Sequence, residues 1–240
     1  MEKKKIAMTA LWAAIPLIFF LRFGDFLTIH ALNNHRSLLC LWAEANTWSA
    51  PLAYITLMSV FISFTVPGAT TLSFAGGIIF QQPWAALYAY IGFVVGACGS
   101  YWAVRLLFWE LASGWLKGVK GYSRMEKNLK EHGFMYLVFA RYTLVFPFWL
   151  VNAASAIVGV PFLTFAAATA VAVIPGSYIY TTAGRALSSV LDNLDDEGVR
   201  NINISEIVRK TVLESTQVQI CLIAIVVGAS APFIHRFIRK

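Results

Sequence analysis

The chain contains a very long stretch without any charged residue. The 60 residues from Ala45 to Val104 include no Asp, Glu, Lys or Arg, although these make up about a quarter of an ordinary soluble domain. A second stretch of 60 residues, from His132 to Leu191, carries only Arg141 and Arg185. One span needs about 20 apolar residues, so each stretch is long enough to enter a bilayer more than once.

The composition agrees with this interpretation. Of the 240 residues, 58% are hydrophobic and 13% are charged, which excludes a disordered chain and an ordinary soluble domain. The net charge of +7 comes from residues that flank apolar segments. We expect these to contact the anionic headgroups of membrane lipids, with no nucleic acid as a partner. The sequence leaves the oligomeric state open, a homo-oligomer included.

The sequence contains no recognisable metal-binding or catalytic motif. The three cysteines are isolated, the histidines show no metal-ligand spacing, and no hydrolase signature is present. We therefore expect no metal, no cofactor and no enzyme activity.

Proline and glycine interrupt both apolar stretches. Unpaired backbone at membrane depth is tolerated only inside protein or beside a wet cavity, so we expect broken, re-entrant helices. The breaks are Pro67-Gly68, Gly76-Gly77 and Gln81-Gln82-Pro83 in the first stretch, and Pro147, Gly159, Pro161 and Pro175-Gly176 in the second.

The distribution of Lys and Arg distinguishes two paths through the membrane. If the N-terminus is cytoplasmic and residues 50–82 cross fully, six basic residues lie inside and eleven outside. If residues 50–82 form a hairpin that enters and leaves on one side, twelve lie inside and five outside. The hairpin is therefore favoured.

The fold class that follows is an all-α polytopic membrane protein with two opposed re-entrant helical hairpins, about four full spans and amphipathic interfacial helices. Residues 1–49 hold the first span (6–21) and an external amphipathic helix (26–44). Residues 50–187 form the core. Half one (50–108) holds the first hairpin (50–82) and span two (84–108), and a basic cytoplasmic helix (109–132) follows. Half two (134–187) holds the second hairpin (134–159) and span three (162–187). Residues 188–240 hold an external acidic segment, the last span (217–235) and a basic C-terminus, and both termini are expected to be cytoplasmic. Arg22 and Asp25 follow the first span where a small-residue cleavage site would stand in a signal peptide, so we expect this span to be retained.

The two halves resemble one another. Val66-Pro67, Pro83-Trp84, Gly99-Ser100-Tyr101 and Arg105 recur in order as Phe146-Pro147, Pro161-Phe162, Gly176-Ser177-Tyr178 and Arg185. Because the favoured path places the two hairpins on opposite sides, the repeats are inverted. In inverted-repeat transporters, substrates bind where broken helices meet near the midplane.

Arg141 is the main candidate for a binding residue. It lies six residues before Pro147 in an apolar segment, where a charge costs at least roughly 2.5 to 3.5 kcal/mol. The two long stretches contain no Asp or Glu to pair with it, so we expect an anionic ligand, a phosphate or a carboxylate, to be its partner. The alternative is that the side chain extends to the cytoplasmic headgroups.

Other candidates are weaker. Asn152 either donates to the same anion or satisfies the broken backbone. Arg105 and Arg185 stand near span ends and are expected to anchor headgroups. Pro67, Gly68, Gly76 and Gly77 either expose backbone N–H groups to an anion or only kink the helix.

Two pairs of segments resemble a known family. SFTVPGATTLSFAGGIIF with GACGSYWAVRLL, and FARYTLVFPFWLVNAASAIVG with IPGSYIYTTAGRAL, are similar to the DedA superfamily, and most to its VTT-domain (SNARE-associated Golgi protein) branch. The resemblance covers about residues 50–187. It implies two opposed re-entrant hairpins and the movement of lipids between leaflets, polyprenyl phosphate in bacteria and phospholipids in eukaryotic relatives.

The resemblance also places individual residues. Arg141, Pro147 and Asn152 match the branch's R-x-x-P-x-x-P and downstream Asn, although Leu144 replaces the first proline. Pro67-Gly68 and Gly76-Gly77 match its PG and GG. The acidic residues that flank PG in DedA proteins are missing here, which argues against proton coupling and favours a passive or differently coupled mechanism.

Our leading hypothesis is a lipid translocator of the bacterial inner membrane that holds an anionic headgroup while the acyl or prenyl tails stay in lipid. A small-anion transporter using the same cavity is the second hypothesis, and it requires an enclosed path instead of one open to the bilayer. A membrane scaffold that acts through the basic helix from Lys117 to Lys130 is the third, and it makes Arg141 dispensable.

Overall fold

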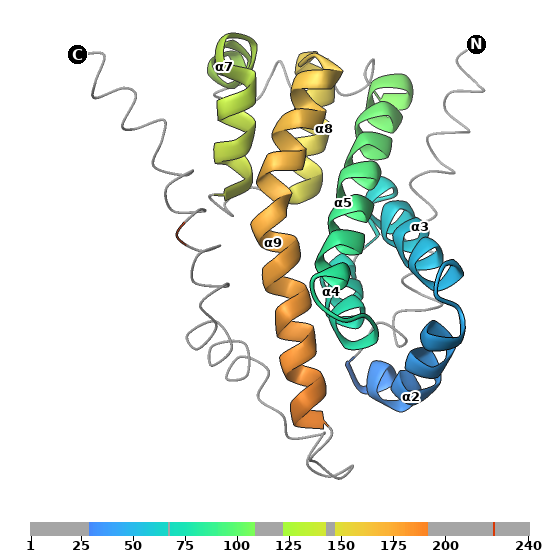
Figure 1. Ribbon diagram of the computed structural model, residues 1–240. Coiled ribbons are helices and arrows are strands. Elements are labelled where there is room, and N and C mark those ends of the chain that lie inside the picture. Colours follow the sequence, from blue (N-terminus) through green and yellow to red (C-terminus); the bar gives the residue numbers. More distant parts are fainter. Residues whose placement is uncertain (1–28, 67, 109–121, 143–146, 192–222, 224–240) are drawn as a thin grey trace.

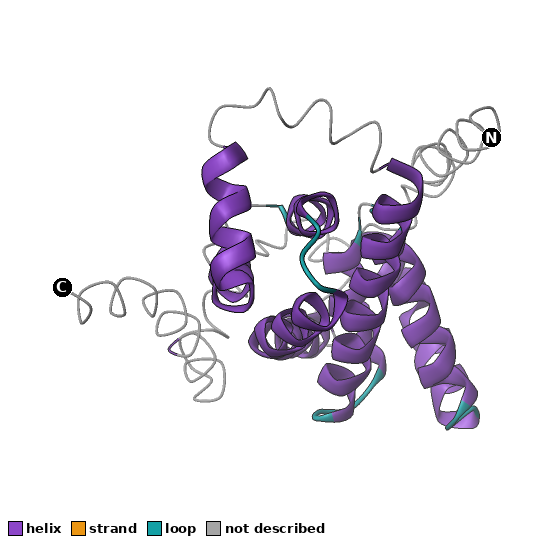
Figure 2. Cartoon of the chain, turned by 90° about the horizontal axis from the view of Figure 1, so that it is seen from above, coloured by secondary structure: helices purple, strands orange, loops and turns teal. Residues whose placement is uncertain are grey.

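The computed structural model describes residues 29–66, 68–108, 122–142, 147–191 and 223. Within these ranges all regular structure is helical, as Figure 2 shows from above. The predicted first and last spans, the external acidic segment and residues 109–121 of the basic helix lie outside the described residues. The all-α fold class is confirmed for the core.

Two long helices form the centre of the molecule (Figure 1). Helix α5 (Trp84–Ala103) continues into a π-helical turn, η2 (Val104–Phe108), and α9 spans Phe162–Leu191. Both are long and apolar enough to cross a membrane. They coincide with predicted spans two and three and differ at the C-terminal end of α9, which extends to Leu191.

Hydrogen bonds at both ends show that α5 and α9 are antiparallel. The Tyr101 hydroxyl, near the end of α5, donates to the carbonyl of Val160, just before α9 begins, at 2.6 Å. At the other end, Gln82 Nε2, just before α5, donates to Thr181 Oγ1 on α9 at 2.7 Å. Gln82 and Val160 each precede the proline at the start of one long helix. Each of them is hydrogen-bonded to the other long helix.

The first helical pair is α3 (Ser49–Ser63) and α4 (Ala69–Ile79), within the predicted hairpin 50–82. At about 1.5 Å per residue, neither is long enough to cross the hydrocarbon core of about 30 Å. Thr65 with φ 58° and Gly68 with φ 121° turn the chain between them. This pair is called hairpin one below.

Hairpin one is joined closely to α5. Ser63 Oγ donates to the carbonyl of Gly96 at 3.1 Å, and Ser59 Oγ lies 3.4 Å from the carbonyl of Gly92. Glycines at the contact allow two helix backbones to approach, as is common between membrane helices.

The second pair is α7 (Tyr122–Tyr142) and α8 (Phe148–Val158). Helix α7 is kinked at His132 (φ −134°), where the predicted basic helix ends and the predicted hairpin begins. Helix α8 ends at Gly159, whose φ of 82° is left-handed and favours glycine. The part of α7 after the kink and α8 together are called hairpin two.

The two hairpins lie at opposite ends of the long helices (Figure 1). Helix α4 leads into the start of α5, and α8 leads into the start of α9. Because α5 and α9 are antiparallel, the hairpins approach the middle of the molecule from opposite directions. This is the arrangement that the inverted repeat in the sequence predicts for the helices.

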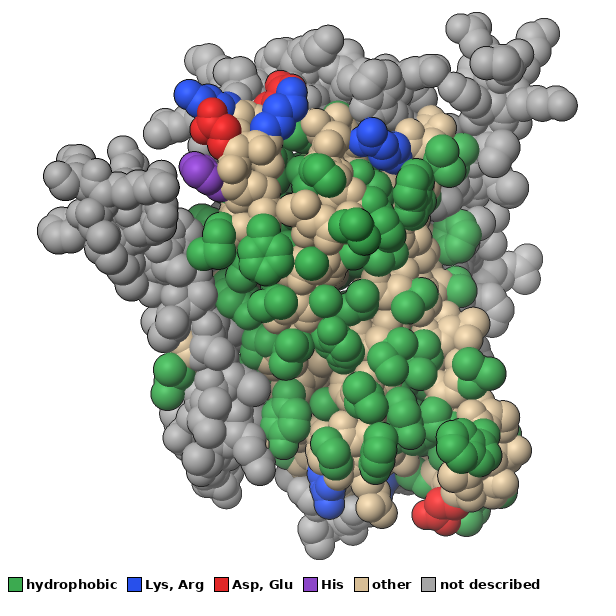
Figure 3. All heavy atoms as spheres, turned by 45° about the horizontal axis from the view of Figure 1, so that its top comes forward, with side chains coloured by type: hydrophobic (Ala, Val, Ile, Leu, Met, Phe, Trp, Pro, Cys, Tyr) green, Lys and Arg blue, Asp and Glu red, His purple; other side chains and the backbone are tan. Residues whose placement is uncertain are grey.

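Charged and hydrophobic side chains occupy different levels of the surface along the long helices. On the face in Figure 3, the described charged side chains gather at the two ends and hydrophobic ones cover the band between them. At one end, Lys127 and Lys130 pair with glutamates one turn away, at 3.9 Å and 2.6 Å. At the other, α2 (Ile29–Ala45), the predicted amphipathic helix, exposes apolar side chains, Leu38, Leu41 and Trp42.

Candidate functional site

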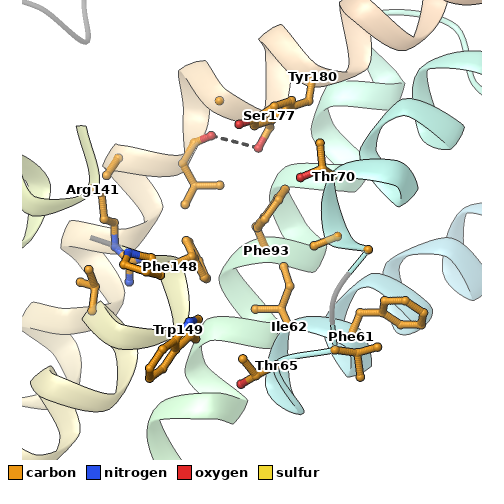
Figure 4. A pocket seen from close by; sticks show the side chains of 18 residues that line it. Phe61, Ile62, Thr65, Thr70, Phe93, Arg141, Phe148, Trp149, Ser177 and Tyr180 are labelled. Atoms are coloured by element: carbon orange, nitrogen blue, oxygen red, sulfur yellow. Dashed lines mark hydrogen bonds between the residues drawn. The ribbon is translucent and has the colours of Figure 1, made fainter. Parts of the chain in front are cut away.

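A cavity of about 630 Å³ lies where the two hairpins meet. Its volume is in the range of small-molecule binding sites. Hairpin one, hairpin two, α5 and α9 all contribute to its wall (Figure 4). Among the described lining residues, Arg141 alone carries a charge.

Arg141 is held by two neutral side chains. Its Nη2 donates to Asn152 Oδ1 on α8 at 2.9 Å and to Thr169 Oγ1 on α9 at 2.8 Å. Asn152 and Thr169 are fully buried, and the Thr169 hydroxyl in turn donates to the carbonyl of Phe165 at 2.7 Å. The guanidinium is therefore fixed between hairpin two and α9.

Two aromatic rings stack on the same guanidinium. The carbon Cζ of Arg141 lies 4.5 Å from the ring centre of Phe148 and 5.5 Å from that of Phe165. Such cation–π contacts stabilise by about 0.5 to 2 kcal/mol, more where water is excluded. In Figure 4, Phe148 lies directly beside the end of the Arg141 side chain.

Three donor atoms of this cluster lack acceptors. Arg141 Nε, Arg141 Nη1 and Asn152 Nδ2 are buried and have no hydrogen-bond partner among the described residues. Leaving a buried donor unpaired costs about 1 to 3 kcal/mol, and more for a charged group. The cluster is thus a cationic site with unused donors and without a carboxylate among its described contacts.

The structure distinguishes the two alternatives for Arg141. Its guanidinium points inward to Asn152 and Thr169 and does not extend toward the charged first part of α7. Asn152 accepts from Arg141 instead of capping broken backbone. Pro147 precedes α8 and lines the cavity, whereas Leu144 lies outside the described residues.

The predicted residues of hairpin one separate into two groups. Gly68 lines the cavity, and its φ of 121° is one that residues with side chains rarely adopt. Pro67 lies outside the described residues. Gly68 therefore remains a site candidate because it forms part of the wall.

Gly76 and Gly77 lie in a different environment from Gly68. The sequence predicts that they belong to the binding site, but both are buried inside α4 and neither is among the described lining residues. A Cβ on Gly76 would collide with the ring of Tyr54, and one on Gly77 with the backbone of Thr181. They serve the close packing of α4 against α3 and α9.

Arg105 has a role in packing that its position in the sequence does not indicate. It lies in η2, and its Nη1 donates to the carbonyl of Ala156 in the last turn of α8 at 3.2 Å. A cation at a helix C-terminus interacts favourably with the helix dipole. Arg185 is exposed on α9, which is compatible with the predicted headgroup anchor.

Sequence reasoning did not identify Thr169, Phe148, Phe165 or Gly176 as parts of the site. Thr169 is one of several hydroxyl residues in an apolar helix, and the sequence does not show which of them faces Arg141. For Phe148 the sequence does contain a weak indication of a place in the site. It directly follows Pro147 and therefore lies at the start of α8.

Fold and site together define a class: a helical protein with two long apolar helices and two opposed hairpins around a buried cation. Residues 66–186 match the sequence model of the VTT domain, which is half of the chain, and the chain belongs to this family. The predicted family is confirmed at this level.

Three curated relatives are similar over part of their length. Transmembrane protein 41 homolog of Drosophila melanogaster is 30% identical over 140 residues, 58% of this chain and 42% of the relative. Transmembrane protein 41B of Xenopus tropicalis and of Homo sapiens are each 28% identical over 138 residues, 57% of this chain and 49% and 47% of those proteins. The chain spans about half the length of these relatives, and no solved structure matches it.

Proposed function

We propose that this protein moves an anionic lipid, a polyprenyl phosphate or a phospholipid, between the two leaflets of its membrane. The observation that carries the proposal is the pair of unpartnered Arg141 donors, Nε and Nη1, beside a cavity between the hairpins. A charge buried there without a described carboxylate partner is unfavourable unless an anion binds to it.

The donor set suits a phosphate group. A guanidinium presents a planar fork that binds two phosphate oxygens at once, and Asn152 Nδ2 adds a further donor close by. Phe148 and Phe165 pack on the guanidinium, and its free donors are buried. Headgroup binding therefore requires the Phe148 ring to move aside.

The shape of the cavity favours a lipid over a small hydrophilic anion. Trp149 and Tyr180 line the cavity and are also 51% and 37% exposed at the surface. Because these two residues contact both the cavity and the surface, we infer that lipid tails extend from the cavity to the outside of the protein. A small anion would need an enclosed path with polar walls, and most of the described lining residues are apolar.

The orientation in the membrane is part of this proposal. The bands of charge at the two ends of the face in Figure 3 support headgroup contacts at both levels, and α3, α4 and α8 are short enough to re-enter. Cytoplasmic termini and a bacterial inner membrane stay predictions from the sequence, and the three relatives named above are animal proteins.

Reconstitution into liposomes tests the proposal. Purified protein is inserted into vesicles that carry a fluorescent phosphatidic acid, and a membrane-impermeant quencher reports the fraction in the outer leaflet. At first the quencher cannot reach the fluorescent lipid of the inner leaflet. We expect this lipid to become accessible in wild-type vesicles and to remain protected with Arg141→Gln. Passage of inorganic phosphate without passage of the lipid would instead support the small-anion hypothesis.

A further inference from the structure

The cavity wall differs between the two halves of the repeat. Arg141 stands six residues before Pro147, and the residue six before Pro67 is Phe61. Phe61 lines the same cavity and is 2% exposed. The position that carries the cation in half two therefore carries an aromatic ring in half one.

The glycines of the repeated Gly-Ser-Tyr motif also differ. A Cβ on Gly99 would collide with the Ser63 hydroxyl, so this glycine is packed against hairpin one. A Cβ on Gly176 would meet nothing within 4 Å, and Gly176 lines the cavity. Gly176 thus borders open space where its counterpart in half one borders protein.

Most of the described side chains that line this cavity are apolar. Ile62, Val66, Phe93 and Val173 are among them, and Thr65, Thr70 and Tyr180 line it as well. The hydroxyl of Ser177, next to Gly176, donates a hydrogen bond to the carbonyl of Val173 at 2.9 Å. Its proton therefore needs no water molecule in the cavity as an acceptor. Apolar cavities of this kind favour hydrocarbon over water.

We propose that Phe61, Ile62, Phe93, Val173 and Gly176 form a hydrocarbon subsite, which binds the first part of a lipid chain while Arg141 binds the anionic group. The inference rests on the proposed function. It narrows the ligand to an amphiphile whose anionic headgroup and hydrocarbon chain are both bound by the protein. The sequence-based expectation that the tails stay wholly in lipid is changed accordingly. Beyond its first part, the chain extends out of the cavity into the bilayer.

Water-soluble phosphate monoesters test the subsite without interference from partition into the bilayer. Methyl phosphate and hexyl phosphate carry the same headgroup and differ in chain length. Binding is measured to the full chain in nanodiscs of zwitterionic lipid. We expect wild-type protein to bind hexyl phosphate at least about tenfold more tightly than methyl phosphate, because methylene groups buried in an apolar site improve affinity by factors of this order.

Two substitutions on α9 test whether the hydrocarbon chain binds beside Gly176. Gly176→Leu fills the open space, so we expect it to weaken hexyl phosphate binding by about tenfold and to leave methyl phosphate binding unchanged. Ile174→Phe is the matched control, since Ile174 is 55% exposed on the same helix, and it should change neither affinity. Equal affinity of wild-type protein for the two esters would overturn the subsite, whether or not Gly176→Leu folds.

The outcomes separate this inference from the function on which it rests. Arg141→Gln should weaken both esters equally, because both share the headgroup. If lipid translocation depends on Arg141 while chain length has no effect on binding, the subsite is wrong and the proposed function stands. If neither ester binds in an Arg141-dependent way and no lipid moves, the proposed function itself fails.

Discussion

The hydroxyl of Tyr101 donates a 2.6 Å hydrogen bond to the carbonyl of Val160, 59 residues further along the chain. Both residues are almost completely buried, so this bond joins the end of α5 to the start of α9 away from solvent. It also fixes the point where hairpin two passes into α9, and thereby the position of the wall that carries Thr169.

Removing this hydroxyl should destabilise the core. Tyr101→Phe leaves the Val160 carbonyl buried without its donor, which costs about 1 to 3 kcal/mol. Thermal unfolding in detergent measures the change, with Tyr88→Phe as the control because Tyr88 is only half-buried. Equal midpoints for the two variants would show that the bond contributes nothing to stability.

Two glycines should respond in opposite ways to alanine. Gly77→Ala places a methyl group on the backbone of Thr181, and overpacking of this kind costs about 1 to 3 kcal/mol. Gly176→Ala places one in open space and should stabilise α9 by up to about 1 kcal/mol, since alanine favours helices over glycine. The same unfolding assay checks both, and a stabilised Gly77→Ala variant would contradict the close contact of α4 with α9.

Phe148 is expected to control access to Arg141. Its ring lies 4.5 Å from the guanidinium, so Phe148→Ala should expose Arg141 to an arginine-specific reagent such as phenylglyoxal. The modification of the peptide that contains Arg141 is followed by mass spectrometry, with Trp149→Ala as a control at the rim of the cavity. An unchanged rate of modification in Phe148→Ala would show that some other group covers the site.

Arg105 and Arg185 each follow the Gly-Ser-Tyr motif of their half of the repeat but should differ in importance. Arg105→Gln removes the donor to the last turn of α8 and should cost up to about 1 kcal/mol, the usual size for a cation at a helix end. Arg185→Gln, on an exposed position, should leave the free energy of unfolding within about 0.5 kcal/mol of wild type. Equal losses would argue against the capping role of Arg105.

The elements of the core follow from the sequence because their signals are local. Pro83 and Pro161 mark the starts of the two long helices, and Gly68 and Gly159 stand at turns of the chain. The predicted breaks at Gly76-Gly77 and Pro175-Gly176 are wrong, because α4 and α9 continue through them. The opposed placement of the hairpins follows from loop charge and from the repeat. These signals depend on composition and spacing, which one sequence shows directly.

The contacts of the site are less accessible to sequence reasoning. The isolated charge of Arg141 indicates its importance, and the nearby Asn152 is found as well. Thr169 is 28 residues away on another helix, and only the packing of α7 against α9 brings it close. Gly76 and Gly77 are packed closely inside α4, and a glycine needed for helix packing has the same sequence signal as one beside a ligand.

Lipid translocation in liposomes by Arg141 variants shows whether this guanidinium binds the headgroup that is moved. Arg141→Gln should lower the rate at least about tenfold, because hydrogen bonds to a charged group contribute about 1.5 to 3 kcal/mol. Arg141→Lys, which keeps the charge without the fork, should retain part of the rate. Thermal unfolding of each variant in detergent confirms that the fold is intact. Wild-type translocation by a folded Arg141→Gln protein would contradict the account.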